Sequence, residues 1–190
     1  EKYKLELPAP NAKSVCAGDF NGDGKQEILF VSNGKLRMFF QRECGFGPAD
    51  LIDFDVEVEN VASADFDGDG ITDLVFKNKD GKAGIIFGSK EGLDIANILW
   101  LETAGGKDKE ELEGSTAGAA AGMTSWRPCV VTINGVQYLF IVEGEKFYLF
   151  TCNAAREVSV AKTFECPGAV CAAAADINGD GYEELAVAVF

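Results

Sequence analysis

The residues of this chain best suited to chemistry are acids at regular spacing in short glycine-rich segments. In Asp65–Phe76 (DFDGDGITDLVF), carboxylates stand at positions 1, 3, 5 and 9, and an apolar run follows. The same spacing recurs in Asp19–Phe30 (DFNGDGKQEILF) and Asp176–Val187 (DINGDGYEELAV), with asparagine at position 3. Glycine at position 6 permits the backbone to curl, so that alternate side chains can converge on one point. Such a set of oxygens suits Ca2+, which binds six to eight oxygen ligands at about 2.3–2.6 Å.

The predicted ligands are the side chains at positions 1, 3, 5 and 9 and the backbone carbonyl at position 7. Mg2+ is less well suited, because it requires a rigid octahedron and retains its waters. The first loop provides Asp19, Asn21, Asp23, Glu27 and the Lys25 carbonyl; the second provides Asp65, Asp67, Asp69, Asp73 and the Ile71 carbonyl; the third provides Asp176, Asn178, Asp180, Glu184 and the Tyr182 carbonyl.

Two other interpretations of these loops are weaker. An EF-hand requires a bidentate glutamate at position 12 and flanking helices, whereas position 12 is Phe30, Phe76 or Val187 and the flanks are rich in strand-forming residues. Asp-Gly can also mark a simple hairpin turn. A turn alone has no use for converging acids in three separate copies, so we expect about three calcium sites.

Charge and composition narrow the classes of function. The 190 residues carry a net charge of −14, which argues against nucleic acid as a partner because phosphates require a basic face. The predicted ligands include 3 + 4 + 3 = 10 carboxylates, and three divalent ions would reduce −14 to −8. The chain has no histidine, which removes the commonest general base. No stretch approaches the roughly 20 apolar residues of a membrane span, so we expect no membrane insertion.

Six cysteines, an even number, accompany the loops, and none forms a C-x-x-C pair. Together with loops suited to extracellular calcium, they favour an oxidising compartment in which disulfides persist. The alternative is that several are buried apolar residues, as cysteine often is. The six are Cys16, Cys44, Cys129, Cys152, Cys166 and Cys171, and their pairing cannot be deduced from sequence.

Short apolar strands and tight turns predict an all-β fold of repeated units. Asn33-Gly34 and Asp80-Gly81 lie between such runs, a strong hairpin signal. Intervals between loop starts give a period of about 46 residues, once an insertion at 102–122 is removed. The expected four-stranded units span approximately 11–58, 59–101, 123–164 and 165–190, the last incomplete. In the third unit Thr132 replaces the first aspartate, and we expect that unit to bind no calcium.

The three loop sequences resemble the calcium loops of FG-GAP repeats, as in the integrin alpha-subunit β-propeller, and the related bacterial VCBS-type repeats. Gly84–Leu93 (GIIFGSKEGL) resembles the "FG" segment that names the former. The resemblance implies a β-propeller, typically of about seven four-stranded blades. About four units are present here, so we expect a propeller segment that belongs to a longer chain or is completed by other subunits.

The three loops, the acidic charge, the cysteines and the absence of catalytic residues favour a non-catalytic, calcium-stabilised scaffold for protein binding or adhesion, outside the cell or on its surface. A lectin-like propeller that binds glycans is one alternative, and a polysaccharide-active enzyme module is another. Candidate partner-binding residues are Trp100, Trp126 and the insertion at 102–122, although both tryptophans could instead pack in the core.

Overall fold

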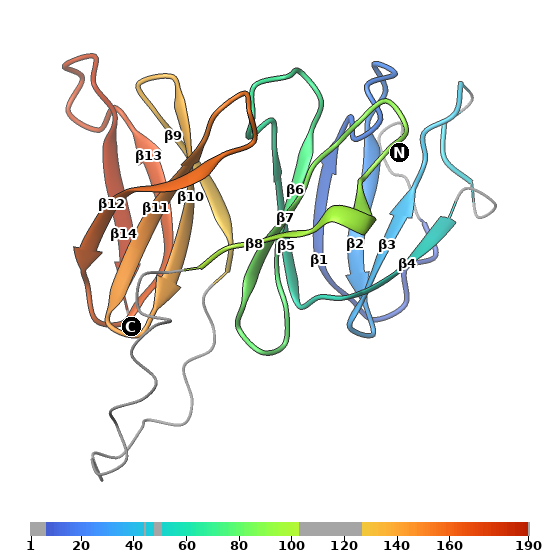
Figure 1. Cartoon of the computed structure of the whole chain (residues 1–190), viewed down its shortest axis with the longest axis horizontal. Helices are drawn as coiled ribbons and strands as arrows, with labels where there is room; N and C mark the ends of the chain where they lie inside the picture. The colour runs from blue at the N-terminus through green and yellow to red at the C-terminus, as the bar shows by residue number, and fades with distance from the viewer. Residues whose placement is uncertain (1–6, 44, 48–50, 103–126, 190) are drawn as a thin grey trace, which may run out of the picture. The chain divides into compact units, whose positions relative to one another are not determined.

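The computed structural model describes residues 7–43, 45–47, 51–102 and 127–189 (Figure 1). These residues form β-strands and one short 3-10 helix, connected by turns and loops. They divide into two compact units, Glu1–Leu99 and Trp100–Phe190, and the division falls within β8. Nowhere in the described ranges is there a helix long and apolar enough to span a membrane. The insertion at 102–122 and Trp126, both predicted to be candidates for partner binding, lie outside the described residues except for residue 102.

The first unit contains two four-stranded antiparallel sheets in which the strands follow one another in chain order. The first sheet comprises β1 (Ala12–Gly18), β2 (Glu27–Ser32), β3 (Lys35–Phe39) and β4 (Leu51–Glu57). The second comprises β5 (Asn60–Ala64), β6 (Asp73–Lys77), β7 (Ala83–Ile86) and β8 (Leu99–Trp100).

The second unit contains one four-stranded sheet and one two-stranded sheet, also with consecutive antiparallel strands. The four-stranded sheet comprises β9 (Cys129–Ile133), β10 (Val136–Glu143), β11 (Lys146–Cys152) and β12 (Val158–Glu165). The two-stranded sheet pairs β13 (Ala169–Ala175) with β14 (Glu184–Val189). This order of strands is that of propeller blades, in which each blade is an antiparallel meander.

The Asn-Gly dipeptides form the tight turns that the sequence predicts. Asn33 and Gly34 both have positive φ, at 52° and 77°, and join β2 to β3 with Ser32 opposite Lys35. Asn134 and Gly135 repeat this geometry, at 51° and 78°, between β9 and β10. Positive φ at both central residues matches the twist of the flanking strands. In the third predicted repeat (residues 123–164), therefore, a two-residue turn replaces the long acidic loop.

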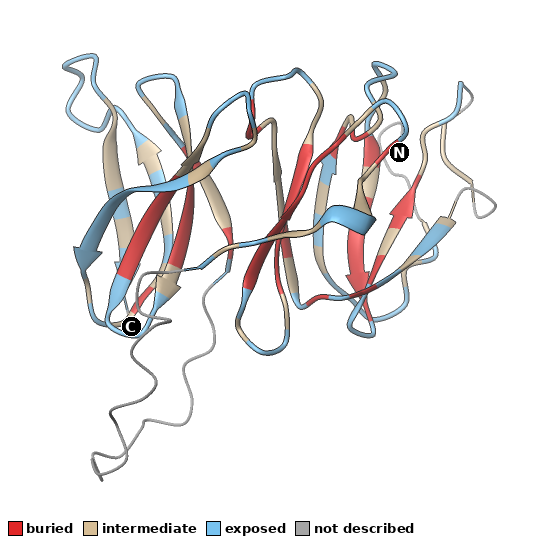
Figure 2. Cartoon of the chain, viewed as in Figure 1, coloured by how far each residue is buried: buried red, intermediate tan, exposed pale blue. Residues whose placement is uncertain are grey.

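Each unit has its own apolar core, and the inner strands hold most of the buried residues (Figure 2). In the first unit Leu29, Val31 and Met38 from the first sheet pack with Leu74 and Phe76 from the second. In the second unit the two sheets bury another set: Val131, Phe140, Phe147, Leu149 and Ala169, with Leu185 and Val187 packed against them. Apolar burial of this kind stabilises by about 25 cal/mol per Å2, and here it fastens neighbouring sheets together within each unit.

One expected strand is largely replaced by a turn. The sequence predicts an outer strand at 95–101, but Ile95–Asn97 form a 3-10 helix and only Leu99 and Trp100 remain as β8. The Asn97 side-chain amide donates to both carboxylate oxygens of Asp94, at 3.1 and 2.9 Å. This local hydrogen bonding competes with strand pairing, while Ile95 and Ile98 still pack against the core.

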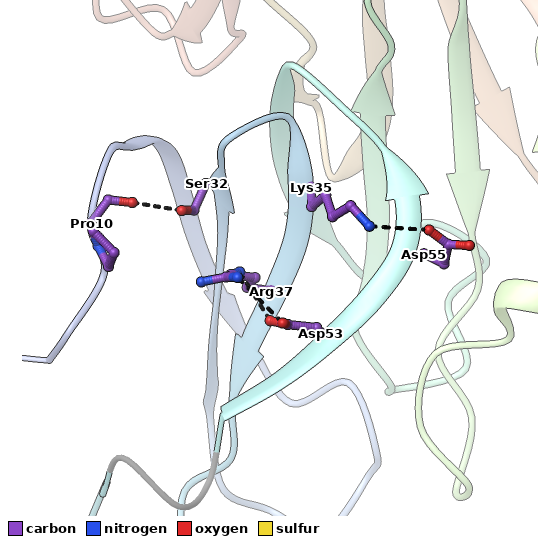
Figure 3. Close-up of polar contacts among 6 residues, drawn as sticks. All are labelled: Pro10, Ser32, Lys35, Arg37, Asp53 and Asp55. Atoms are coloured by element: carbon purple, nitrogen blue, oxygen red, sulfur yellow. Dashed lines mark hydrogen bonds and ion pairs between the residues drawn. The ribbon is translucent and has the colours of Figure 1, made fainter.

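The acids of β4 neutralise basic side chains and are not part of the glycine-rich loops. Arg37 Nε lies 2.9 Å from Asp53 Oδ1, and Lys35 Nζ lies 3.4 Å from Asp55 Oδ1 (Figure 3). The same close-up shows the Ser32 hydroxyl donating to the Pro10 carbonyl at 2.6 Å, which holds the N-terminal lead-in beside β2. Exposed ion pairs of this type contribute roughly 0–1 kcal/mol each.

The expected disulfides are not found where they can be examined. No disulfide joins any two of the five cysteines that the structure describes; Cys44 lies outside the described residues. Cys16 instead packs against the core of the first unit, and its burial raises the pKa of the thiol to about 12. Cys129 and Cys166 likewise pack against the core of the second unit. These three side chains fit the alternative reading of cysteine as a partly buried apolar residue.

Candidate metal centre

Each acidic loop connects the first strand of a sheet to the second, between β1 and β2, β5 and β6, and β13 and β14. Glycines at positions 4 and 6 have positive φ in all three loops, for example 78° at Gly68 and 88° at Gly70. A side chain is strained in that region of conformational space. The two glycines therefore let the backbone reverse, so that amides of the loop can reach the side chains at positions 1, 3 and 5.

The three loops share one hydrogen-bond arrangement. The position 6 amide donates to position 1 Oδ2: Gly24 to Asp19 at 2.8 Å, Gly70 to Asp65 at 3.0 Å, and Gly181 to Asp176 at 2.9 Å. The position 5 amide donates to position 3 Oδ1: Asp23 to Asn21 at 2.9 Å, Asp69 to Asp67 at 3.1 Å, and Asp180 to Asn178 at 2.8 Å. The position 7 amide donates to position 5 Oδ1 at 2.8, 2.8 and 2.9 Å, from Lys25, Ile71 and Tyr182 respectively. These hydrogen bonds orient the side chains at positions 1, 3 and 5 before any ion arrives.

The acid at position 9 closes each loop onto its own beginning. Its carboxylate accepts from the position 2 amide: Glu27 from Phe20 at 3.1 Å, Asp73 from Phe66 at 2.7 Å, and Glu184 from Ile177 at 2.9 Å. Glu27 and Asp73 are fully buried. Asp73 also accepts from the Gly88 amide at 2.9 Å, which ties the second loop to the residues after β7. Position 9 is therefore the point where the loop joins the core of the sheet.

The second loop gathers its acids most tightly. Carboxylate oxygens of Asp65, Asp67 and Asp73 all lie within 4.8 Å of one another. Two oxygens bound to one Ca2+ at about 2.3–2.6 Å are at most about 5.2 Å apart, so this spacing fits a shared ion. Asp69 carries the fourth predicted carboxylate, and its Oδ1 accepts from Ile71 N. Among the described residues no other loop brings three carboxylates this close.

Two buried oxygens in the loops have no hydrogen-bond partner among the described residues, and both belong to predicted ligands. They are Oδ1 of Asp65, at position 1 of the second loop, and Oε1 of Glu27, at position 9 of the first. A buried carboxylate oxygen without a partner costs free energy. A divalent cation would supply the missing interaction, so the donor set and its unsatisfied atoms fit calcium.

Burial and crowding perturb the acids of the first two loops. Burial raises the pKa of Asp73 to about 6, amides of Gly88 and Phe66 oppose the rise, and the charge of Asp67 adds to it. Burial likewise raises the pKa of Glu27, with contributions from the charges of Asp23 and Asp19. The metal-free loops therefore hold negative charges in an environment that disfavours them.

Stability of the metal-free protein is expected to fall as the pH rises from about 4 to about 6. The folded state holds the Asp73 proton more tightly than the unfolded chain does, whose carboxyl has the ordinary pKa of 3.8. That contribution is complete below pH 3.8 and is lost as the pH rises through about 6. In chelator, the midpoint of thermal unfolding should be higher at pH 5 than at pH 7, and Asp73→Asn should reduce the difference. A higher midpoint at pH 7 would contradict this assignment.

The third loop places its predicted ligands differently. Asp176, Asn178 and Asp180 are exposed, and the Asn178 side-chain amide donates to Glu184 Oε1 at 2.9 Å. Position 2 of this loop, Ile177, is 68% exposed, whereas Phe20 and Phe66 at the same position are buried. The third loop has the backbone arrangement of the other two, but its side chains are more exposed to solvent.

The sequence does not show that the first two loops contact each other. The Thr72 amide donates to the Asp19 carbonyl at 2.8 Å, and the Asp19 amide donates to Thr72 Oγ1 at 3.1 Å. The neighbouring Gly18 has room for no side chain, because an added Cβ would lie 2.4 Å from Thr72 Cγ2. Gly18 is a sequence signal that could have indicated the contact, because a glycine in a strand often marks the close approach of another segment.

A family model described as an FG-GAP-like repeat matches residues 19–76, from the first acid of the first loop to the strand after the second. Residues 19–76 are thus similar to an FG-GAP-like repeat. The matched range includes both loops of the first unit and the contact between them. The same loop pattern at Asp176–Glu184 lies beyond the matched range.

Solved structures place the repeat in a propeller fold. The crystal structure of BBS1N in complex with ARL6DN, soaked with mercury, matches with a TM-score of 0.51 and 10% identity, over 98% of this chain and 50% of that chain. The lead-soaked crystal of the same complex matches with a TM-score of 0.51 and 13% identity, over 98% of this chain and 53% of that chain. The chain thus spans about half the length of these structures and shares their fold. A comparison with curated proteins gave no match.

Proposed function

We propose that this chain is a calcium-stabilised segment of an extracellular β-propeller that serves as a scaffold for binding other proteins and performs no catalysis. The single observation that carries the calcium claim is the pair of buried, unpartnered oxygens on Asp65 and Glu27, each within a loop that directs its acids inward. Bound calcium supplies positive charge that offsets the crowded carboxylates. It has a structural role in this proposal.

The residues that would hold the ions are those of the three loops. The second loop offers four carboxylates, and the first and third offer three carboxylates and an asparagine each. More anionic ligands and greater rigidity raise calcium affinity. The second loop, with three carboxylates gathered within 4.8 Å and two of them buried, should therefore bind most tightly.

An extracellular setting follows from the same loops, because Ca2+ is abundant outside cells and loops of this kind are used there at high calcium concentration. The five described cysteines add no support, since none of them is in a disulfide. Two considerations favour a protein partner. The fold is a propeller, whose loops present broad faces, and the similar BBS1N was crystallised with a second protein, ARL6DN. A glycan partner is the competing outcome.

Calorimetric titration of the full chain with calcium tests the proposal. We expect about three ions per chain, and Asp65→Ala combined with Asp69→Ala should remove one of them, the tightest. Asp53→Ala is the matched control, because it also deletes an acid but one paired with Arg37 on β4. Binding of no calcium, or an equal loss of binding in the control, would overturn the assignment.

A further inference from the structure

The two acidic loops of the first unit contact each other through Thr72 and Asp19, and the proposed function does not use this contact. Thr72 occupies position 8 of the second loop, between two predicted ligands of that loop, the carbonyl of Ile71 and the side chain of Asp73. It makes two hydrogen bonds to the backbone of Asp19, one through its amide and one through its hydroxyl, at 2.8 and 3.1 Å. Asp19 is position 1 of the first loop. One residue therefore links a ligand of one loop to two ligands of the other.

The packing around Thr72 leaves it little freedom. An added Cβ at Gly18 would lie 2.4 Å from Thr72 Cγ2, and an added Cβ at Gly88 would lie 2.3 Å from the Thr72 carbonyl oxygen. On the same side, an added Cβ at Gly22 would lie 3.1 Å from Ile71 Cδ1. Because backbone surrounds Thr72 closely on two sides, a shift of the second loop must be passed to the first loop or resisted by it.

The second unit contains a related contact, with one hydrogen bond in place of two and with no acidic loop on the facing sheet. There Glu183, at position 8 of the third loop, accepts through Oε2 from the Asn134 amide at 2.7 Å. Asn134 lies in the two-residue turn that replaces an acidic loop. In the second unit, position 8 of the loop thus contacts the preceding sheet where that sheet has no acidic loop. A substitution of Glu183 therefore serves as a control for substitutions of Thr72 in the first unit.

We infer that Thr72 couples the two metal-binding loops of the first unit, so that a divalent cation held by Asp65–Asp73 raises the affinity of Asp19–Glu27 for a second one. The inference rests on the proposed function, because it requires calcium to bind both loops. An ion in the second loop fixes the Ile71 carbonyl and Asp73, and thereby fixes Thr72 between them. Asp19 is then held in place before its own ion arrives, so the first loop loses less conformational freedom on binding. Thr72 is a positioning residue in this account and touches no ion.

The test is a set of calcium titrations of the full chain, followed by NMR at the Gly24 amide, which donates to Asp19 Oδ2 and so reports on the first loop. The third loop is disabled throughout with Asp176→Ala and Asp180→Ala. Disabling the second loop with Asp65→Ala and Asp69→Ala should weaken calcium binding by the first loop at least about fivefold, which is the low end of the couplings seen between two binding sites. Thr72→Val removes the hydroxyl and keeps the shape of the side chain. In that background, disabling the second loop should weaken calcium binding by the first loop by less than about twofold.

Two further variants separate a specific link from general damage. Thr72→Ser keeps the hydroxyl and should retain most of the coupling. Glu183→Ala should retain all of it, because Glu183 lies in the second unit, which has only one proposed site and no second site to couple with it. If Thr72→Val fails to fold in the absence of calcium, Thr72→Ser and the loop-disabled wild type still measure the coupling. If disabling the second loop weakens calcium binding by the first loop equally with Thr72 and with Val at residue 72, the inference is overturned and calcium binding itself is not. No response of the Gly24 amide to calcium in the wild type would overturn the inference, and no calcium binding at any loop would overturn the proposed function as well.

Discussion

Chelation of divalent cations is expected to lower the midpoint of thermal unfolding of this chain by roughly 10 °C. A site kept at 100 times its dissociation constant stabilises the folded state by about 2.7 kcal/mol. For a chain of this length, each kcal/mol shifts the midpoint by about 2–4 °C. The first unit holds two of the proposed sites, including the one with the most carboxylates, and should respond more than the second.

The variant Asp65→Ala combined with Asp69→Ala shows whether the effect arises in the loops. Its midpoint in calcium should fall toward that of the chelated wild type, and chelation should then change it little. Asp53→Ala should behave as the wild type does in both conditions, because its carboxylate pairs with Arg37 away from the loops. An unchanged wild-type midpoint on chelation would remove calcium from the account.

The second large effect is expected from Gly88→Ala. An added Cβ at residue 88 would lie 2.3 Å from the Thr72 carbonyl oxygen and 2.7 Å from Ile71 Cγ2. The backbone must therefore shift, and overpacking of this kind costs about 1–3 kcal/mol, occasionally more. The shift would also weaken the hydrogen bond from the Gly88 amide to Asp73. We expect a loss of about 3 kcal/mol in the free energy of unfolding and weaker calcium binding by the second loop.

Denaturant unfolding of Gly88→Ala in calcium and in chelator measures both effects. Lys90→Ala is the control, because Lys90 is exposed two residues further along the same connection. A loss below about 0.5 kcal/mol in Gly88→Ala, the ordinary range for surface substitutions, would show that the connection after β7 does not press on the second loop.

Much of this fold is encoded locally and could be predicted from the sequence. The sequence predicts strands at 27–32, 73–77 and 146–152, and β2, β6 and β11 have these bounds, because Asn-Gly, Asp-Gly or Glu-Gly-Glu turns flank short apolar runs. The hairpin at Asn33-Gly34 depends only on two neighbouring residues that accept positive φ. The loops are equally local, since all their shared hydrogen bonds connect residues at most seven apart. Such features can be predicted from the sequence because a few adjacent residues determine them.

Other features depend on side-chain contacts that the residue pattern does not indicate. The link from Thr72 to Asp19 spans 53 residues and uses a residue type found at many surface positions. The replacement of the strand at 95–101 by a 3-10 helix reflects a side-chain contact between Asp94 and Asn97 that competes with pairing. The expected disulfides relied on the parity of six cysteines, and parity says nothing about which thiols meet in space.

A crystal structure of the full chain grown with calcium tests the central claim most directly. The account predicts ion density in the second loop, bound by Asp65, Asp67, Asp69, Asp73 and the Ile71 carbonyl at about 2.3–2.6 Å, with corresponding ions in the first and third loops. Asp65 Oδ1 and Glu27 Oε1, which lack hydrogen-bond partners here, should both contact an ion. Loops that open toward solvent, with no density between their acids at saturating calcium, would contradict it.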